Sequence, residues 1–299
     1  MNERLLGLLR CPSCALPLAF EGSRLRCEGG HEHPLVDGIP VFAGAELIAD
    51  DPQYQRQRRY FDAEFAQYSG YRLERWRVGY LQRLRRVHAL GGEGAPLVDV
   101  GVGGSGYTVI EAAREGRPAV GCDLSLEGLR AAKRFADEEG VGDRVLFVCC
   151  SAERLPLASE SFDVGLAIAV LEHVPDDGAA LDELARVLRP GGRVWVTVPH
   201  ELRSFSPLLW PPNLLHDRRL GHLRRYGARG LADAGARRGL APVEVQFTGH
   251  PVKLLQIAVA PRLSGELADR FWWWCERRDL RRSGRRRGAM QLSVLFERA

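Results

Sequence analysis

The sequence predicts an α/β fold: a seven-stranded, mostly parallel sheet with helices on both faces, plus a small N-terminal metal-binding module. Two observations predict the sheet. Short apolar runs alternate with helix-patterned segments over the last two thirds of the chain, and strands that alternate with helices pair as a parallel sheet with crossover helices. A glycine-rich loop directly follows the first apolar run. Cysteines gathered near the N-terminus predict the module.

The expected strands are seven short apolar runs. They cover residues 97–100, 119–122, 144–150, 162–170, 193–198, 243–247 and 290–296. Helical patterns lie between them, as at 126–139 and 178–188. The turn-rich segment GGEGAP (91–96) marks where this alternation begins.

The 299 residues are enough for one large domain or two ordinary ones. With 45% apolar and 27% charged residues, the composition is that of a globular protein. We expect a zinc-ribbon-like module over 1–46 and a helical linker that covers the substrate over 47–94. The main domain follows over 95–299, with insertions at 200–226 and 249–289. Spaced aromatic residues from Tyr54 to Tyr80 indicate amphipathic helix in the linker.

Composition also bounds the partners. No run reaches the roughly 18 apolar residues of a membrane span, and the N-terminus lacks a signal-peptide pattern. We therefore expect a cytoplasmic, enzyme-sized protein, monomeric or homodimeric, with no membrane partner. The net charge of +4 excludes a general polyelectrolyte binder. Of 42 basic residues only Lys133 and Lys253 are lysine, which either GC-rich coding or phosphate recognition by arginine would explain.

The N-terminal cysteines have metal-ligand spacing. Cys11 and Cys14 form a CxxC pair, and His31 follows Cys27 by four residues. Thiolates and an imidazole on tight turns are the donors that tetrahedral Zn²⁺ takes. Zinc would also let a segment with little core of its own fold. We expect these four residues to bind Zn²⁺, with His33 as a rival fourth ligand and simple burial of unrelated cysteines as the alternative.

The amino-acid sequence of this segment resembles known zinc-binding domains. LLRCPSCALPL … LRCEGGHEHPLVDGIPVF, within residues 5–42, resembles the small zinc-ribbon-like domain of the tRNA-methyltransferase activator family. It is also similar to the Cys₃His zinc domain that precedes the catalytic domain in some large-subunit rRNA guanine methyltransferases. Gly30 stands where the four-cysteine versions complete a second CxxC, which leaves His31 as the replacement ligand. Both resemblances keep RNA in view as a partner.

The glycine loop points to a nucleoside-containing cofactor. In DVGVGGSG, which starts at Asp99, residues Gly101, Gly103 and Gly106 form GxGxxG, whose glycines allow a tight turn and close backbone approach to a ligand. Two features argue against a nicotinamide cofactor: the acid inside the strand, and little sign of a helix N-terminus after the loop. An acid there suits the cationic, zwitterionic S-adenosylmethionine. Asp123 ends the second strand, where acids accept ribose hydroxyls.

Four segments in order carry a second resemblance. LVDVGVGGSG, VGCDLS, CSAERLPLASESFDVGLAIAVLEHVPD and ELARVLRPGGRVWVTVP, over about 95–200, resemble class I S-adenosylmethionine-dependent methyltransferases, whose sheet is Rossmann-like. LEHV and LRPGGR are similar to the metabolite-methylating branch. The resemblance implies S-adenosylmethionine as cofactor, bound by Asp99, Gly101, Gly103, Gly106, Asp123, Leu124, Ser151, Ala152, Glu153 and Ala169.

Within that set the resemblance implies a division of work. Asp99, Gly101 and Gly103 form the methionine side of the pocket. Asp123 and Leu124 contact the ribose and adenine, and the segment that starts at Ser151 flanks the adenine. The family often has an aspartate where this chain has Ser151. A contact to the adenine amino group is therefore not implied here.

A hydroxyl acceptor needs a proton acceptor, and histidine is the usual one near neutral pH. His200 follows the fifth strand at the carboxyl edge of the sheet, where open α/β sheets build their ligand crevice, so it is our candidate catalytic base. Loop capping or simple exposure is the alternative for His200. The resemblance favours a cofactor-pocket or structural role for His173, and a positional role for His216 and His222 in a lid segment.

Three functions are compatible with these patterns. The favoured one is an S-adenosylmethionine-dependent methyltransferase acting on a small molecule such as a sugar, polyketide or quinone. The alternative is an rRNA or tRNA base methyltransferase that binds RNA with the zinc module. The seven arginines in 277–287 support this alternative, because arginines can neutralise an RNA backbone. The third is a non-catalytic partner of another methyltransferase. The intact glycine loop with Asp99 and Asp123 argues against the third.

Overall fold

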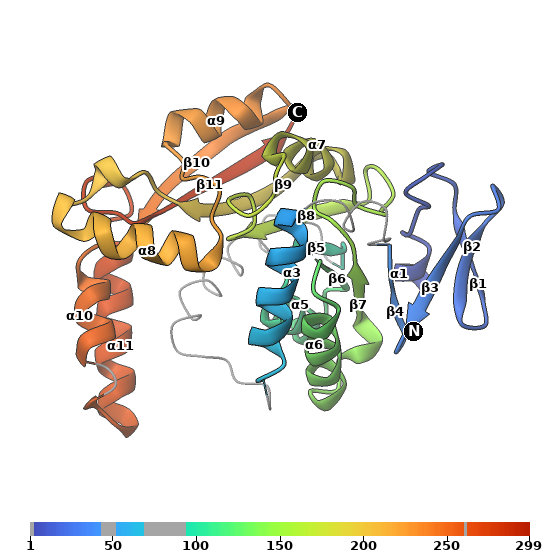
Figure 1. Ribbon diagram of the computed structural model, residues 1–299, viewed down its shortest axis with the longest axis horizontal. Coiled ribbons are helices and arrows are strands. Elements are labelled where there is room, and N and C mark those ends of the chain that lie inside the picture. The colour runs from blue at the N-terminus through green and yellow to red at the C-terminus, as the bar shows by residue number, and fades with distance from the viewer. Residues whose placement is uncertain (1–2, 43–51, 69–93, 260–261) are drawn as a thin grey trace.

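The computed structural model describes residues 3–42, 52–68, 94–259 and 262–299. Part of the expected linker over 47–94, including Tyr71, Trp76 and Tyr80, lies outside these residues. A large central sheet is flanked by helices, and a small sheet stands at one side of it (Figure 1).

The central sheet has seven strands in the order β10-β11-β9-β8-β5-β6-β7. Their bounds are β5 (Leu97–Val100), β6 (Ala119–Asp123), β7 (Val145–Cys149), β8 (Phe162–Ile168), β9 (Leu188–Pro199), β10 (Leu240–Thr248) and β11 (Gln291–Arg298). The strands from β9 to β7 pair in parallel, whereas β11 runs antiparallel to both β9 and β10. The mostly parallel seven-stranded sheet expected from the apolar runs is confirmed.

Helices cover both faces of this sheet (Figure 1). One group is α5 (Tyr107–Arg114) and α6 (Leu126–Glu138), and the other is α7 (Asp177–Val187) and α9 (Ala228–Ala236). Each group contributes its apolar side chains to a separate buried cluster against the strands. The helix α5 begins directly after Gly106, so the expectation that no helix N-terminus follows the glycine loop was wrong.

The N-terminal segment folds as an antiparallel unit. It contains α1 (Glu3–Leu6), β1 (Leu18–Glu21), β2 (Arg24–Cys27), β3 (Glu32–Val36) and β4 (Ile39–Pro40), with the strands in sequential order. The unit joins the outer edge of the central sheet: Val41 bridges Cys149 of β7 in parallel, and the Phe42 amide donates to the Cys149 carbonyl at 2.8 Å. The module is therefore hydrogen-bonded to the sheet that carries the cavity described below.

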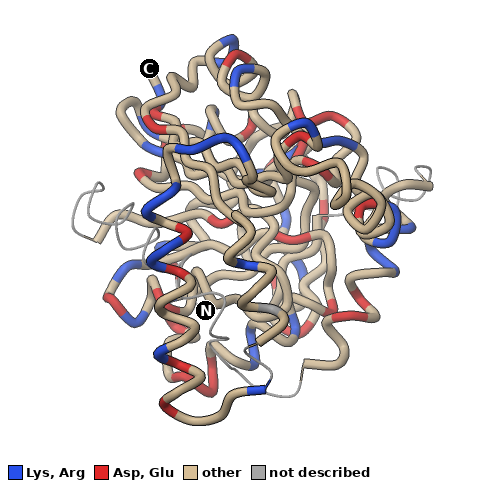
Figure 2. The backbone as a smooth tube through the Cα atoms, turned by 90° about the vertical axis from the view of Figure 1, so that its left-hand side faces the viewer, with Lys and Arg blue, Asp and Glu red and all other residues tan. Residues whose placement is uncertain are grey.

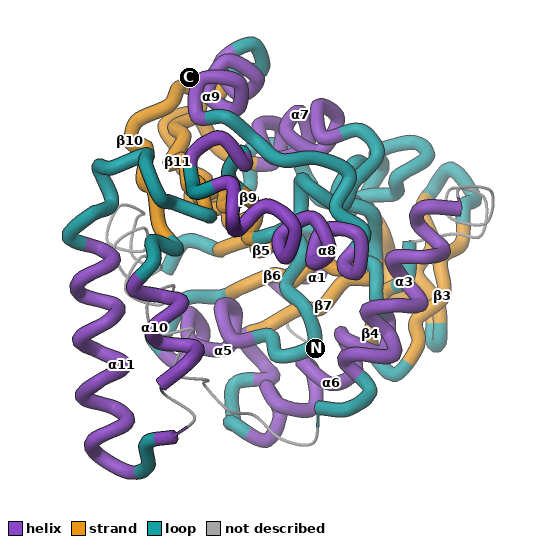
Figure 3. Tube along the Cα trace, turned by 60° about the vertical axis from the view of Figure 1, so that its left-hand side comes forward, coloured by secondary structure: helices purple, strands orange, loops and turns teal. Residues whose placement is uncertain are grey.

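The remaining helices lie beyond the carboxyl ends of the parallel strands. They are α3 (Pro52–Phe65), α8 (Trp210–Leu220), α10 (Val252–Val259) and α11 (Gly265–Leu280), with short 3₁₀ turns at Leu202–Ser204 and Pro207–Leu209. A third 3₁₀ turn, Gly142–Arg144, lies at the amino end of β7 instead. Helix α8 falls in the expected insertion 200–226, and α10 and α11 fall in 249–289. Figure 3 shows α10 and α11 side by side, away from the parallel strands. None of the described helices has both the length and the apolar character of a membrane span.

Candidate functional site

Two cavities lie at the carboxyl edge of the sheet and share one residue. The first cavity, of about 130 Å³, is formed where β5, β6, β7 and β8 end, and helix α3 covers it. The second cavity, of about 530 Å³, is formed by the end of β9 and by α8, α10 and α11. Ala169 lines both cavities and has a left-handed backbone, with φ of 57°. The site is thus a pair of adjoining pockets with a common border.

Most of the predicted cofactor residues meet at the first cavity. Those that line it are Gly101, Gly103, Asp123, Leu124, Ser151, Ala152 and Ala169. Asp99, Gly106 and Glu153 are not among its lining residues. The structure therefore gathers the glycine loop and the ends of β6, β7 and β8 around one hollow.

The glycine loop is held by close packing and by the second-strand acid. Gly101 has φ of 77°, and a Cβ there would lie 2.2 Å from Cγ2 of Val170. The Gly103 amide donates to Oδ2 of Asp123 at 2.9 Å, and the Ser125 amide donates to its Oδ1 at 2.9 Å. Burial raises the pKa of Asp123 although these bonds favour its charged form. The carboxylate is thereby fixed at the border of the cavity before any ligand arrives.

Asp99 lies beneath the loop. Its side chain is buried, Oδ2 accepts a hydrogen bond from the Thr108 hydroxyl of α5, and Oδ1 has no partner among the described residues. Burial raises the pKa of Asp99 to about 7. Because Asp99 does not line the first cavity, it would influence a cofactor there indirectly, by positioning the glycine loop.

The other two predicted residues outside the lining have structural neighbours. Gly106 starts α5 with φ of 57°, and a Cβ there would lie 2.9 Å from the Cβ of Ala132 in α6. Its lack of a side chain lets the two helices pack closely. Glu153 accepts the Asp176 amide at 2.6 Å, which links the segment after β7 to the start of α7.

Helix α3 supplies cavity residues that the sequence analysis did not assign to the cofactor site. Tyr54, Gln57, Phe61 and Phe65 line the first cavity. The Tyr54 hydroxyl lies 3.0 Å from Oγ of Ser151, and the Gln57 side chain donates to the Gly221 carbonyl at 2.8 Å. Their spacing over three helical turns was the available signal, because it places them on one face. The helix therefore connects the first cavity to the end of α8.

His200 lies away from both cavities. Its ring is fully buried, with Nδ1 at 2.9 Å from the Tyr226 carbonyl and the ring centre 5.2 Å from that of Phe247. Neither cavity includes His200 among its described lining residues. His200 pairs with Tyr226 through a parallel β-bridge, and its side chain is buried there, directly after the end of β9. The structure thus does not bring the predicted base to a cavity.

Other titratable groups lie at the border of the cavities instead. His173 lines the first cavity, and Glu172 and His222 line the second. Each offers one possible metal-ligand atom, a carboxylate oxygen or an imidazole nitrogen, within 4.8 Å of the others. The ring centres of His173 and His222 are 4.8 Å apart. Burial raises the pKa of Glu172 to about 8 and lowers that of His173 to about 3. Both groups are therefore uncharged at neutral pH.

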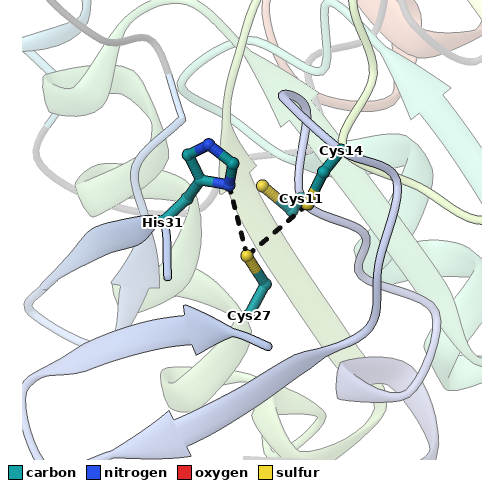
Figure 4. A group of neighbouring side chains, drawn as sticks. All are labelled: Cys11, Cys14, Cys27 and His31. Atoms are coloured by element: carbon teal, nitrogen blue, oxygen red, sulfur yellow. Dashed lines mark hydrogen bonds between the residues drawn. The ribbon is translucent and has the colours of Figure 1, made fainter. Parts of the chain in front are cut away.

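The N-terminal module brings the predicted metal ligands together. Figure 4 shows Cys11, Cys14, Cys27 and His31 converging from two turns. Their ligand atoms lie within 4.8 Å of one another, with Cys14 Sγ 3.5 Å and His31 Nδ1 3.4 Å from Cys27 Sγ. Three sulfurs and one imidazole nitrogen at such spacing fit a tetrahedral zinc ion. The rival ligand His33 lies outside this group of four, with Nε2 3.4 Å from Cys11 Sγ.

Comparisons with known proteins identify the fold. Residues 98–196 match a family model described as a methyltransferase domain. A geranyl diphosphate C-methyltransferase from Streptomyces coelicolor A3(2) has a similar fold, with a TM-score of 0.59 and 16% identity over 84% of this chain and 99% of that one. The chain therefore contains a Rossmann-like α/β methyltransferase fold, as the sequence predicted.

Two curated relatives match part of the chain. A ubiquinone biosynthesis O-methyltransferase from Parvibaculum lavamentivorans is 35% identical over 149 residues, which are 47% of this chain and 58% of the relative. A tRNA 5-carboxymethoxyuridine methyltransferase from Escherichia coli K12 is 40% identical over 113 residues, which are 37% and 43% of the two chains. The chain thus spans about half the length of the curated relatives it matches.

Proposed function

We propose that this chain is an S-adenosylmethionine-dependent methyltransferase that transfers a methyl group to a small-molecule acceptor. The observation that carries the proposal is the pair of cavities that share Ala169. One is built from the glycine loop and Asp123, and the other from the insertions after the sheet. A methyl donor in the first and an acceptor in the second would meet at that border, so that transfer becomes a matter of alignment and exclusion of water.

The residues that line the first cavity support this placement of the cofactor. Asp123, fixed by two backbone amides, is placed to accept the ribose hydroxyls. Leu124, Ser151 and Ala152 border the same side and would flank the adenine. Gly101 and Gly103 leave room for the methionine portion against the loop backbone. When bound, the cofactor supplies a methyl group on a sulfonium, whose departure leaves a neutral thioether.

The second cavity has the size and chemistry of a small-molecule pocket. About 530 Å³ falls in the range of roughly 300–1,000 Å³ that such ligands occupy. Trp272 and Val198 give it apolar wall, while Asn213, Gln256 and Lys253 give it polar groups. The relative named for ubiquinone biosynthesis supports an acceptor of this size class. The sugar, polyketide and quinone classes expected from the sequence all meet these requirements.

RNA is the second candidate acceptor, because one relative is named as a tRNA methyltransferase. Figure 2 shows acidic and basic positions interspersed over the face that carries α10 and α11. In the arginine run, Arg286 is ion-paired with Glu201 and Arg278 lies over the Trp274 ring at 5.7 Å. A phosphate backbone would have to compete with these partners. The small-molecule reading is therefore favoured.

The N-terminal module is proposed to bind Zn²⁺ through Cys11, Cys14, Cys27 and His31. The convergence of their ligand atoms supports this. Hydrogen bonds from His31 act against the effect of burial and lower the pKa of the Cys27 thiol to about 6, which favours the thiolate that binds metal. The ion would hold a module whose strands have few buried residues of their own.

The function is tested by transfer of labelled methyl from S-adenosylmethionine into an extract of the source cells, counted before and after ribonuclease digestion. We expect label in the small-molecule fraction, independent of digestion. Label that becomes acid-soluble only after digestion would make RNA the acceptor. Asp123→Ala should weaken cofactor binding by about 1–3 kcal/mol, because the ribose hydroxyls would lose the carboxylate proposed to accept them. Unchanged affinity in that variant would refute the placement of the cofactor.

A further inference from the structure

The end of helix α8 fixes one histidine against a carboxylate. The sequence DRRLGH closes α8 with Gly221 in the left-handed conformation, at φ of 73°. The amide of the next residue, His222, donates to the Asp217 carbonyl at 2.9 Å, the bond pattern of a helix stop that uses glycine. This fold-back brings the two side chains together, with His222 Nδ1 at 2.8 Å from Oδ1 of Asp217. The pair is therefore built by the local sequence.

Arg225 holds the carboxylate in place. Its Nε donates to Oδ2 of Asp217 at 2.6 Å, and its Nη2 donates to Oδ1 at 2.8 Å. Nη1 donates to the His200 carbonyl at 3.0 Å, which anchors the guanidinium to the end of β9. Burial opposes ionisation of Asp217, but the bonds from Arg225 lower its pKa overall. Asp217 is thus a fixed anion across the neutral range.

A fixed anion sets the tautomer of its histidine. A carboxylate only accepts hydrogen bonds, so Nδ1 of a neutral His222 must carry the proton and Nε2 must carry the lone pair. The His222 side chain is 8% exposed and lines the second cavity. Its ring is 4.8 Å from that of His173, which lines the first cavity. The His222 ring, which carries the basic nitrogen, therefore lies beside the border across which a methyl group would pass.

We propose that His222 is the general base for an acceptor that is methylated on a hydroxyl oxygen, with Asp217 and Arg225 as positioning residues. This inference rests on the proposed methyltransferase function and narrows it to O-methylation. It gives His222, rather than His200, the role of proton acceptor.

A second observation points to a polar acceptor at the same place. Glu172 lines the second cavity, is 1% exposed, and its Oε2 has no hydrogen-bond partner among the described residues. An unsatisfied buried oxygen beside a cavity is the kind of group that a ligand satisfies. Because Glu172 is uncharged at neutral pH, it can donate to an acceptor oxygen while His222 removes a proton.

The reaction balances with these groups alone. The acceptor oxygen forms a bond to the methyl carbon, which gives up its bond to sulfur together with the electron pair. Nε2 of His222 takes the hydroxyl proton and becomes imidazolium beside the Asp217 carboxylate. The proton then leaves to water as product departs. The groups that face His222 are Asp217, Arg225, His216, His173 and Glu172, and burial lowers the pKa of His222 so that it starts neutral at physiological pH.

The first test needs neither acceptor nor activity. Nitrogen chemical shifts of ¹⁵N-histidine protein distinguish the two neutral tautomers, and the His222→Gln variant assigns the signal. We expect the proton on Nδ1 of His222 in the wild type. In Asp217→Asn the other tautomer should become populated, because an amide can also donate. A wild-type ring with its proton on Nε2 would overturn the proposal.

The second test uses labelled S-adenosylmethionine with the small-molecule extract of the source cells. We expect His222→Gln to lower kcat by about 10²-fold or more and to remove the acid limb of the kcat–pH profile. Imidazole should partly rescue His222→Gly. His200→Gln is the matched control, because the buried His200 ring lines neither cavity. Its kcat and acid limb should stay near wild type, and cofactor affinity should be unchanged in all variants.

Two failures are distinguishable. No transfer by the wild-type chain into any extract contradicts the methyltransferase function itself, while the tautomer measurement still decides whether the pair is built as a base. Transfer by the wild type with an unaltered acid limb in His222→Gln contradicts the base assignment alone. In that case methylation proceeds on an atom that needs no proton acceptor.

Discussion

The Tyr54 hydroxyl lies 3.0 Å from Oγ of Ser151, which ties helix α3 to the end of strand β7 across the first cavity. Ser151 Oγ also accepts the Glu153 amide at 3.2 Å. The serine thus links the cover of the cavity to the loop that borders it. A cofactor bound there would be enclosed by α3, and the strength of that enclosure can be measured.

Removal of the Tyr54 hydroxyl should weaken cofactor binding. Tyr54→Phe and Ser151→Ala should each cost about 0.5–1.5 kcal/mol of S-adenosylmethionine affinity, and the double variant should cost little more than either, because both remove the same bond. Calorimetric titration measures this. Tyr60→Phe is the control, since Tyr60 is on the same helix outside the cavity lining. Strict additivity of the two losses would contradict a direct bond.

Gly101 should tolerate no side chain. In Gly101→Ala the new Cβ would lie 2.2 Å from Val170 in addition to the left-handed strain of φ 77°, so we expect loss of cofactor binding and a drop in stability. Gly116→Ala is a matched control with φ of 84° and open space around its Cβ. That variant should show the strain alone, about 1–2 kcal/mol in urea unfolding, with normal affinity. Equal affinities in the two variants would show that the loop lies outside the cofactor site.

The fourth zinc ligand can be identified by comparing two nearby histidines. His31→Ala should lower the zinc content of the purified protein well below one ion per chain, because it leaves three thiolates to hold the ion. His33→Ala should retain zinc, since His33 lies outside the group of converging ligand atoms. Atomic absorption on both proteins gives the answer. The opposite result would exchange their roles, and zinc-free wild-type protein of normal stability would remove the metal altogether.

The contribution of Glu172 to the stability of the cofactor-free protein should fall as pH rises. Glu172 has a pKa of about 8 in the folded chain, above its ordinary value of 4.5, so the folded state holds this proton when the unfolded state has released it. This contribution is therefore lost between about pH 4.5 and 8, at up to about 1.4 kcal/mol per pH unit, and the loss levels off above that range.

Urea unfolding of wild type and Glu172→Gln at several pH values isolates this contribution. The variant should lose less stability between pH 5 and pH 8 than the wild type does. The slope that remains combines Asp99, whose pKa is raised to about 7, with His173, whose pKa is lowered to about 3 and which acts in the opposite direction below about pH 6.5. Identical slopes in the two proteins would show that Glu172 ionises normally in the folded chain.

The sheet could be predicted from the sequence because its inner parallel strands β5, β6 and β8 are short apolar runs buried over most of their length. The first turn of α5 could not be predicted in this way, since the helix starts at the left-handed Gly106, and the glycine-rich segment before it has the composition of a loop. Strand β9 begins at Leu188, five residues before the expected start, because LRPGGR continues the strand as a bulged extension.

The histidines show where sequence reasoning stops. Position after a strand correctly places His200 at the carboxyl edge, but the packing of the insertion on Tyr226 decides where its ring points. The pairing of His222 with Asp217 depends on a glycine helix stop, and that signal was present in DRRLGH. The convergence of this pair with Glu172 joins segments 45 residues apart in the chain, from Glu172 to Asp217, and only the tertiary fold shows it.

The attachment of the N-terminal module has a consequence for self-association. Strand β7 is the outermost parallel strand, and its edge would present free amides and carbonyls to any other extended chain. Val41 and Phe42 occupy part of that edge by pairing with Cys149. Detachment of the module would uncover a five-residue, fully buried apolar strand. By pairing with part of the β7 edge, the module thus limits edge-to-edge aggregation of the sheet.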